Sequence, residues 1–124
     1  MTWPPKVGEP LPRADEAFGV HEKLAGYSLN VTHEDGGPKA RGFRSILGIT
    51  LDDLDYLAHS IEVGVLATPV GSVRANPPHG ANCIVVIPVR GLGEKSARIV
   101  DVRTVWEIAK QGARPRLVSA FPRP

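Results

Sequence analysis

The spacing of hydrophobic residues changes once along this chain, from a helical to a strand-like period, near Gly64. Before that point apolar residues recur at helical intervals, at Leu51, Leu54, Leu57, Ala58 and Ile61. After it they alternate, most clearly over residues 98–108, where Val102 and Trp106 are expected on one face of a strand and Arg103 on the other. Helices followed by strands are typical of α+β domains. The sequence therefore predicts two to three N-terminal helices packed on one face of a three- to five-stranded antiparallel sheet.

The first half contains signals for two helices before residue 50. Residues 20–28 predict a short helix, weakened by Gly26 because glycine disfavours the helical state. Residues 33–48 predict a glycine-rich loop that leads into a second helix. Pro38 suits the first position of that helix, and Gly48 suits a left-handed conformation at its end.

Thr50 and Asp53 mark the start of a third helix. They match a capping box in which aspartate replaces the usual glutamate. Asp52, Asp53 and Asp55 lie in the first turn, where negative charge complements the helix dipole. This placement favours a structural role over a metal site, and we expect the helix to end at Gly64.

The second half predicts an antiparallel meander. Its expected strands are one or two short ones within 65–73, followed by 83–89, 98–108 and 116–121. Loops at 76–81 and 111–114 and a hairpin at 91–95 connect them. Pro88 has no backbone N–H to donate, which indicates a bulge or a sheet edge at that position.

Four prolines stand within the first twelve residues, so residues 1–12 predict an extended arm. We expect it to pack along the domain, with Trp3 covering a hydrophobic edge. The chain has 124 residues, of which 42% are hydrophobic, and residues 13–124 therefore predict one α+β domain.

Several classes of protein are disfavoured. Cys83 is the one cysteine, so it forms no internal disulfide, and we expect an inert buried thiol. The histidines are dispersed and no phosphate-binding loop is present, which predicts no metal and no cofactor. No apolar run is long enough to cross a membrane and the start lacks the pattern of a signal peptide, so the expected location is cytoplasmic.

The net charge of +2 hides two unlike halves. Residues 1–62 carry six Lys/Arg against ten Asp/Glu, whereas residues 63–124 carry nine against three. The cations of the second half are mostly arginine, whose guanidinium suits bidentate contact with phosphate or carboxylate. This favours an anionic partner such as RNA. The alternative is that these arginines only solvate the outer face of the sheet.

RNA can be cleaved without metal through its own 2′-hydroxyl, given groups that move protons and cations that stabilise the phosphate. The candidate catalytic residues are His33, Lys39, Arg103 and Thr104, and the candidate substrate-binding residues are Arg41, Arg116 and Ser119. His33 lies just before a predicted helix start, where free backbone N–H groups favour an anion.

Each catalytic candidate has a structural alternative. In the alternative for His33, the imidazole only closes a turn through a backbone hydrogen bond. In the alternative for Lys39, the side chain is a solvated helix residue. In the alternative for Arg103, its side chain pairs with Asp101 or Glu107, two positions away on the same strand face. Thr104 is an ordinary strand threonine whose hydroxyl finds a buried partner.

Several segments together resemble an uncharacterised family of bacterial domains. They are Lys23-Leu-Ala-Gly-Tyr-Ser-Leu-Asn30, His33 with Gly36-Gly37, Lys39-Ala40, Phe43 and Leu47-Gly48, then Val102-Arg-Thr-Val-Trp106, and Pro115-Arg-Leu-Val-Ser-Ala-Phe121. Members of that family read KLxxYLLNxxHxxGxxKAxxFxxxLG near the start and vRTxW with PRLVTxY near the end. The resemblance spans about residues 12–122.

Members of the family occur as free-standing proteins and as C-terminal tips of polymorphic toxins, and they resemble ribonuclease toxins of the barnase, colicin and RelE-like type. The resemblance implies a small α+β domain that acts on RNA and is neutralised by a cognate immunity protein or antitoxin. It marks the same four catalytic candidates, with Tyr27 and Asn30 supporting the loop. The chain departs from the family pattern at Ser28, Ser119 and Phe121, which replace leucine, threonine and tyrosine.

These observations lead to a principal hypothesis and two alternatives. The principal one is a toxin-like, metal-independent ribonuclease in which His33, Lys39 and Arg103 meet at one cleft. The first alternative is a non-catalytic accessory protein of a toxin or biosynthetic operon that docks an acidic protein or peptide through its arginine-rich sheet. The second is an enzyme that acts on a different small molecule.

Overall fold

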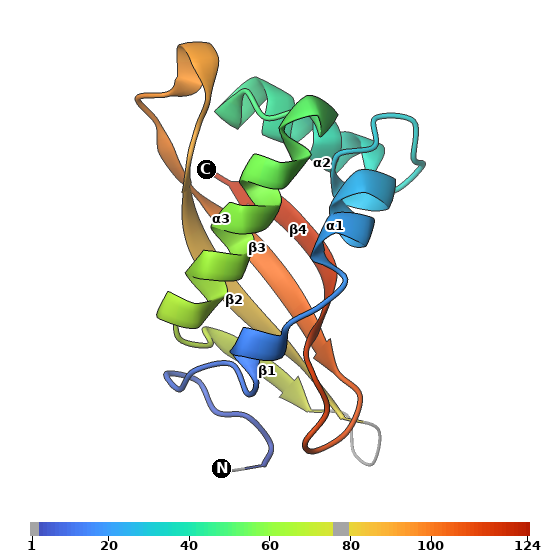
Figure 1. Ribbon diagram of the computed structural model, residues 1–124, viewed down its shortest axis with the longest axis vertical. Coiled ribbons are helices and arrows are strands. Elements are labelled where there is room, and N and C mark those ends of the chain that lie inside the picture. The colour runs from blue at the N-terminus through green and yellow to red at the C-terminus, as the bar shows by residue number, and fades with distance from the viewer. Residues whose placement is uncertain (1–2, 76–79) are drawn as a thin grey trace.

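Three helices precede a four-stranded antiparallel sheet in the computed structural model, which describes residues 3–75 and 80–124 (Figure 1). The helices are α1 (Val20–Lys23), α2 (Gly37–Gly42) and α3 (Leu54–Ala67). The first two continue as π-helical turns, Leu24–Ser28 and Phe43–Leu47 respectively. The strands are β1 (Ser72–Ala75), β2 (Ala81–Arg90), β3 (Ile99–Ile108) and β4 (Arg116–Arg123). The predicted α+β class is confirmed.

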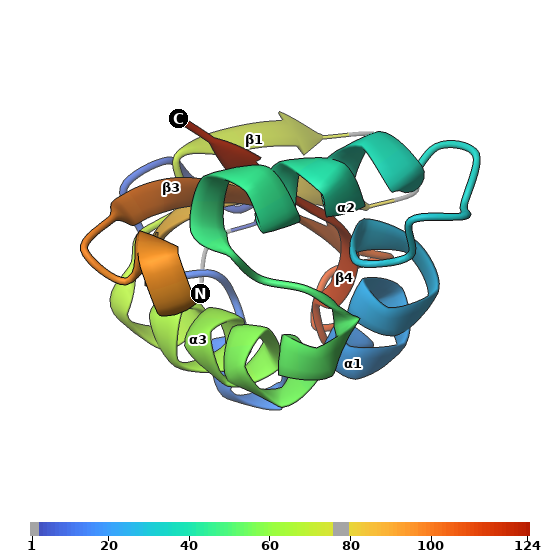
Figure 2. The same cartoon turned by 90° about the horizontal axis from the view of Figure 1, so that it is seen from above.

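The sheet is a meander in the order β1-β2-β3-β4. Alternate residues of β2 and β3 are buried, as the period of two predicts, and the largest buried side chain is that of Trp106. Helix α3 lies along the inner face of the curved sheet, and α2 crosses one end of it (Figure 2). Strand β4 is an edge strand, and the chain that enters α1 lies beside it, with Phe18 bridged to Arg116.

The N-terminal arm packs against the segment that follows α3. Gly8 donates its backbone N–H to the Val70 carbonyl, and Val70 donates to the Glu9 carbonyl. Leu11 is buried in the core, and Trp3 is partly buried against it. The arm is therefore held by both backbone hydrogen bonds and apolar contact.

Two local signals at helix ends are confirmed, the capping box and Gly48. Thr50 and Asp53 form both hydrogen bonds of the capping box. Gly48 ends the helical segment at a φ of 67°, in the left-handed conformation that glycine adopts without strain. Pro88 lies in the part of β2 beyond the reach of β1, so its missing N–H faces a free sheet edge.

The boundaries around the third helix were predicted wrongly. Helix α3 continues through Gly64 to Ala67, and the first strand begins only at Ser72. A Cβ on Gly64 would lie 2.3 Å from Cγ2 of Ile87 in β2. Glycine therefore marks a close approach of helix and sheet here rather than a helix end. Residues 76–79 of the expected 76–81 loop lie outside the described residues, and Ala81 already belongs to β2.

This contact gives a stability prediction. The Gly64→Ala variant should lose about 1–3 kcal/mol of unfolding free energy, since overpacking against Ile87 exceeds the gain in helix propensity. Urea unfolding measures the change. The exposed neighbour provides a control, because Val63→Ala should change stability by less than about 0.5 kcal/mol. A more stable Gly64→Ala protein would contradict the close approach.

Candidate functional site

His33 organises the turn that leads into α2. Its Nδ1 accepts hydrogen bonds from the backbone N–H groups of Asp35, at 3.0 Å, and Gly36, at 2.9 Å. Gly37 donates its N–H to the His33 carbonyl. The N–H groups of this turn are thus engaged by His33 itself, which corrects the expectation that they are free for an anion. Because Nδ1 acts as acceptor, we assign the proton of the neutral imidazole to Nε2.

Tyr27 lies at the centre of the candidate site. Lys39 Nζ lies 2.9 Å from the Tyr27 hydroxyl oxygen, to which it donates, and 4.9 Å from the ring centroid. The His33 ring meets the Tyr27 ring edge-on, with centroids 5.0 Å apart and an interplanar angle of 82°. The structure therefore brings His33 and Lys39 together around one phenol. The sequence interpretation assigned Tyr27 only a supporting role, although its position between Lys23 and His33 in the family motif was the signal for it.

A close backbone approach fixes the His33 turn against the Tyr27 segment. A Cβ on Gly36 would lie 2.1 Å from the Tyr27 carbonyl oxygen. Any side chain at this position would push the turn away from the helix that carries Tyr27. Gly36 thus allows the imidazole and the phenol to meet.

A second aromatic ring connects this group to the sheet. Lys39 Nζ and Arg103 Cζ each lie 5.6 Å from the centroid of the Phe121 ring. Arg103 and Phe121 are opposite each other on β3 and β4. His33, Lys39 and Arg103 therefore lie along one continuous surface, with Tyr27 and Phe121 between them.

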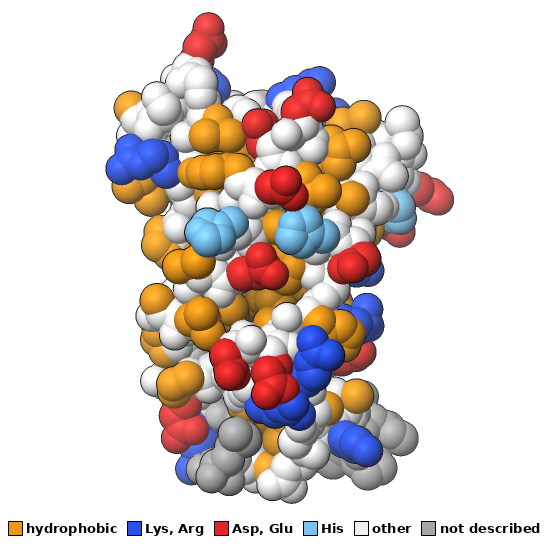
Figure 3. All heavy atoms as spheres, viewed as in Figure 1, with side chains coloured by type: hydrophobic (Ala, Val, Ile, Leu, Met, Phe, Trp, Pro, Cys, Tyr) orange, Lys and Arg blue, Asp and Glu red, His pale blue; other side chains and the backbone are white. Residues whose placement is uncertain are grey.

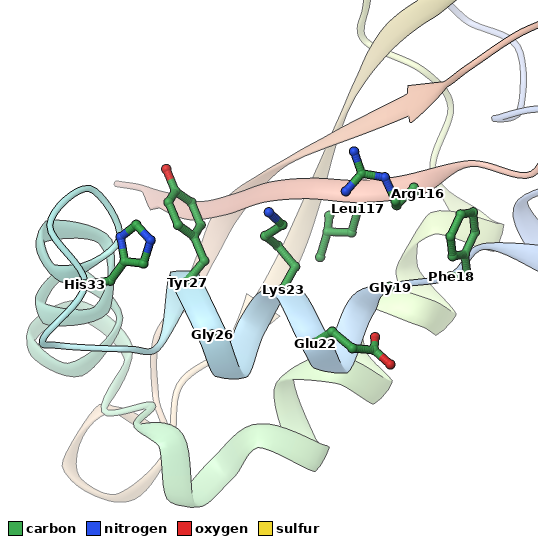
Figure 4. A pocket seen from close by; sticks show the side chains of 9 residues that line it. All are labelled: Phe18, Gly19, Glu22, Lys23, Gly26, Tyr27, His33, Arg116 and Leu117. Carbon is green, nitrogen blue, oxygen red and sulfur yellow. The ribbon is translucent and has the colours of Figure 1, made fainter.

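A pocket of about 610 Å³ extends from this surface between the α1 segment and β4 (Figure 4). Its walls include Phe18, Glu22, Lys23, Tyr27, His33 and Arg116. In Figure 4, His33 and Tyr27 stand at one end and Phe18 at the other, with Lys23 and Arg116 between them. The side chain of Arg116 is 41% exposed and pairs with Glu107 at 3.0 Å. Glu107 was an expected partner of Arg103 and pairs with Arg116 instead.

Thr104 lies outside the candidate site, which corrects its placement among the catalytic residues. It is fully buried, and its hydroxyl donates to the Val85 carbonyl at 2.6 Å. The same oxygen accepts from Trp106 Nε1 at 2.8 Å. This hydroxyl is inside the core and makes hydrogen bonds both as donor and as acceptor, so it has no access to a substrate. The structural alternative for Thr104 is confirmed.

The two remaining candidates lie near the surface just described. Arg41 is exposed on α2 and is not among the residues that line the pocket. Ser119 is half-buried, two residues before Phe121 on β4, and so shares the sheet face of Phe121.

Several arginines of the second half form hydrogen bonds to backbone carbonyls of the protein itself. Arg90 donates to the Ser96 carbonyl, Arg98 to the Ile46 carbonyl and Arg114 to the Glu16 carbonyl. These guanidinium groups are used by the protein itself. The face on which α3 lies carries acidic side chains and histidines among hydrophobic ones, with Lys and Arg side chains mostly toward its edges (Figure 3).

Other reactive groups lie apart from the site. Burial raises the pKa of the Cys83 thiol to about 11, so it stays protonated at neutral pH. Within residues 3–75 and 80–124, no three His, Cys, Asp or Glu side chains are grouped so that they could hold a metal ion. No helix in the same residues is long and apolar enough to cross a membrane.

Comparison with known proteins adds one relationship. No curated protein and no solved structure matches the chain. A family model matches residues 10–124, which include every helix and strand of the structure and all residues around the pocket. The family is described as a domain of unknown function (DUF6883). Since the match covers nearly the whole chain, the protein belongs to the DUF6883 family.

Proposed function

We propose that this domain is a toxin-like ribonuclease that cleaves RNA without a metal ion. The observation that carries the proposal is the 2.9 Å contact between Lys39 Nζ and the Tyr27 hydroxyl, with the His33 imidazole against the same ring. Lys39 donates to the phenol oxygen, so the phenol's own proton is free to be donated outward. A phenol, an ammonium and an imidazole N–H then meet at one exposed surface.

The cations around this phenol suit a phosphodiester. Lys23 and Lys39 lie 5.3 and 4.9 Å from the Tyr27 ring centroid, and Arg103 stands beyond Lys39 on the Phe121 ring. Positioned positive groups stabilise the charge that builds on the phosphate oxygens in the transition state. Nε2 of His33 adds a hydrogen-bond donor at the edge of the same group. The aromatic rings hold the flexible lysines in place through cation–π contacts.

The proposed reaction is a transesterification. The ribose 2′-oxygen attacks the neighbouring phosphorus and its proton passes to water, while the bond from phosphorus to the 5′-oxygen breaks. Tyr27 gives its proton to that departing oxygen, and the Lys39 ammonium stabilises the phenolate that remains. Water then returns a proton to the phenolate. The products are a 2′,3′-cyclic phosphate and a 5′-hydroxyl.

The accessory-protein alternative has less support in the structure. It needs an arginine-rich sheet face that is free to dock an acidic protein, whereas several of those arginines are bonded to the protein's own carbonyls. A cognate immunity protein or antitoxin remains part of the ribonuclease proposal. We expect such a partner to present acidic groups to Lys23, Lys39 and Arg103.

Incubating the purified protein with tRNA in EDTA tests the proposal. The wild type should yield fragments that end in 2′,3′-cyclic phosphate, and Lys39→Met should lower the rate about 10²–10³-fold, as loss of one transition-state donor does. Lys110→Met, at an exposed lysine outside the pocket, is the matched control and should cleave normally.

His33→Asn separates two roles of the imidazole. The asparagine carbonyl can still accept the turn's N–H groups, as Nδ1 does, but the variant lacks Nε2–H. It should fold normally and cleave more slowly than the wild type. Intact tRNA with the wild-type protein, together with normal growth of cells that express it, would contradict the ribonuclease proposal.

A further inference from the structure

The pocket beside α1 is larger than a scissile phosphate requires. Its volume of about 610 Å³ lies within the usual range of about 300–1,000 Å³ for small-molecule sites. Tyr27, the partner of Lys39, stands only at one end of it (Figure 4). The rest of the pocket, toward Phe18, has room for a further part of the substrate.

Gly26 in the pocket wall has no structural reason to be glycine. It lies within the helical segment Leu24–Ser28, where glycine is less favourable than alanine by about 0.5–1 kcal/mol. Its φ is not positive, and an added Cβ would meet nothing within 4 Å. By contrast, a Cβ at the helical Gly64 would collide with Ile87. The missing side chain at Gly26 therefore keeps space open in the pocket rather than serving the packing of the protein.

Phe18 offers an aromatic surface at the far end. Its side chain is 38% exposed, unusual for phenylalanine, and lines the pocket. The backbone of Phe18 is fixed by hydrogen bonds to Pro115 and Leu117 at the start of β4. Arg114 Cζ lies 4.7 Å from the ring centroid. The ring is thus held in place by both its backbone and a stacked guanidinium.

The pocket contains both hydrogen-bond donors and hydrogen-bond acceptors. Lys23 and Arg116 are donors, and the Glu22 carboxylate is an acceptor. A bare phosphate has no donor for a carboxylate and would be repelled by it. A nucleobase has an aromatic face and an edge with both donors and acceptors, which matches this combination.

We propose that this pocket is a nucleobase subsite, which receives a base next to the cleaved phosphodiester and makes single-stranded RNA the substrate class. The inference rests on the proposed ribonuclease function, because it places the base relative to the Tyr27–Lys39 pair. A base in a duplex is stacked and paired, so its face is not free to lie against Phe18 in the pocket. Gly26 leaves the pocket wall without a side chain at this position.

Binding measurements in EDTA test the subsite. The probe is a fluorescein-labelled six-nucleotide RNA of mixed sequence, used as a single strand and annealed to its complement, in a Tyr27→Phe background that leaves it intact. The single strand should bind at least about tenfold more tightly than the duplex. Gly26→Leu should weaken single-strand binding at least about tenfold by filling the pocket, without lowering the midpoint of urea unfolding. Gly71→Ala, outside the pocket and free of close contacts, is the control.

The outcomes separate the two proposals. Equal binding of single strand and duplex, or of the Gly26→Leu variant and its parent, would overturn the subsite even if the wild type cleaves tRNA. Gly26-dependent binding of the single strand by a protein that cleaves no RNA would support the subsite and contradict the ribonuclease. Binding of the mononucleotides AMP, GMP, CMP or UMP without binding of the six-nucleotide RNA would assign the pocket to a free nucleotide and overturn the RNA inference.

Discussion

The Tyr27→Phe variant should cleave tRNA about 10²–10⁴-fold more slowly than the wild type, the usual loss when a general acid is removed. Phenylalanine retains the ring that packs against His33 and Lys39 and removes only the hydroxyl at 2.9 Å from Lys39 Nζ. The departing 5′-oxygen would then leave without a positioned proton donor. Because Tyr27 is only half-buried, the unfolding free energy should change by less than about 1 kcal/mol.

A substrate with a better leaving group distinguishes this role from a structural one. Uridine 3′-(p-nitrophenyl phosphate) releases a phenolate that needs no proton, so Tyr27→Phe should lose far less activity toward it than toward tRNA. Tyr56→Phe is the matched control, since the Tyr56 hydroxyl donates to the Arg90 carbonyl away from the pocket. If Tyr27→Phe cleaves tRNA at the wild-type rate, the Tyr27 hydroxyl is not the general acid.

The Thr104→Val variant should lose about 2–4 kcal/mol of unfolding free energy. Valine has nearly the same shape, but the change leaves the Trp106 indole N–H without a partner in the core and removes the side-chain hydrogen bond to the Val85 carbonyl. Each buried polar group left unsatisfied costs about 1–3 kcal/mol, which is a large share of the stability of a domain of this size. Urea unfolding and the loss of native tryptophan fluorescence report the change.

Thr104→Ser separates the hydrogen bonds from the side-chain volume. Serine keeps the hydroxyl that joins Val85 and Trp106, so this variant should lose much less stability than the valine variant. Cleavage per folded molecule should equal that of the wild type in both variants. If either variant loses most of its cleavage activity while its unfolding free energy is unchanged, Thr104 has a catalytic role after all.

Local signals in the sequence were sufficient for most of the secondary structure. The capping box of Thr50 and Asp53 and the left-handed Gly48 depend on residues within one helical turn. The alternation over 98–108 correctly separated buried Val102 and Trp106 from half-buried Arg103. Such features follow from backbone geometry and the period of each element, which neighbouring residues decide.

Features that depend on distant contacts were assigned wrongly or missed. Gly64 looked like a helix end because its partner, Ile87, stands on another element. The two hydrogen bonds to His33 Nδ1 depend on the conformation of the 33–36 turn, which spacing alone does not specify. Tyr27 was assigned to loop support because its contact with Lys39 joins two helical segments, and the sequence does not show how those segments pack together.

The sequence by itself determined the order of helices and strands, their caps and their buried faces, since these depend on propensity and period over a few residues. Only the tertiary structure decided which charged groups share a surface. Lys39 and Arg103 are both brought to the Phe121 ring, Arg103 by the register of β3 and β4 and Lys39 by the packing of α2 against β4. No local pattern encodes that meeting, because it is set by how whole elements bury their apolar faces together.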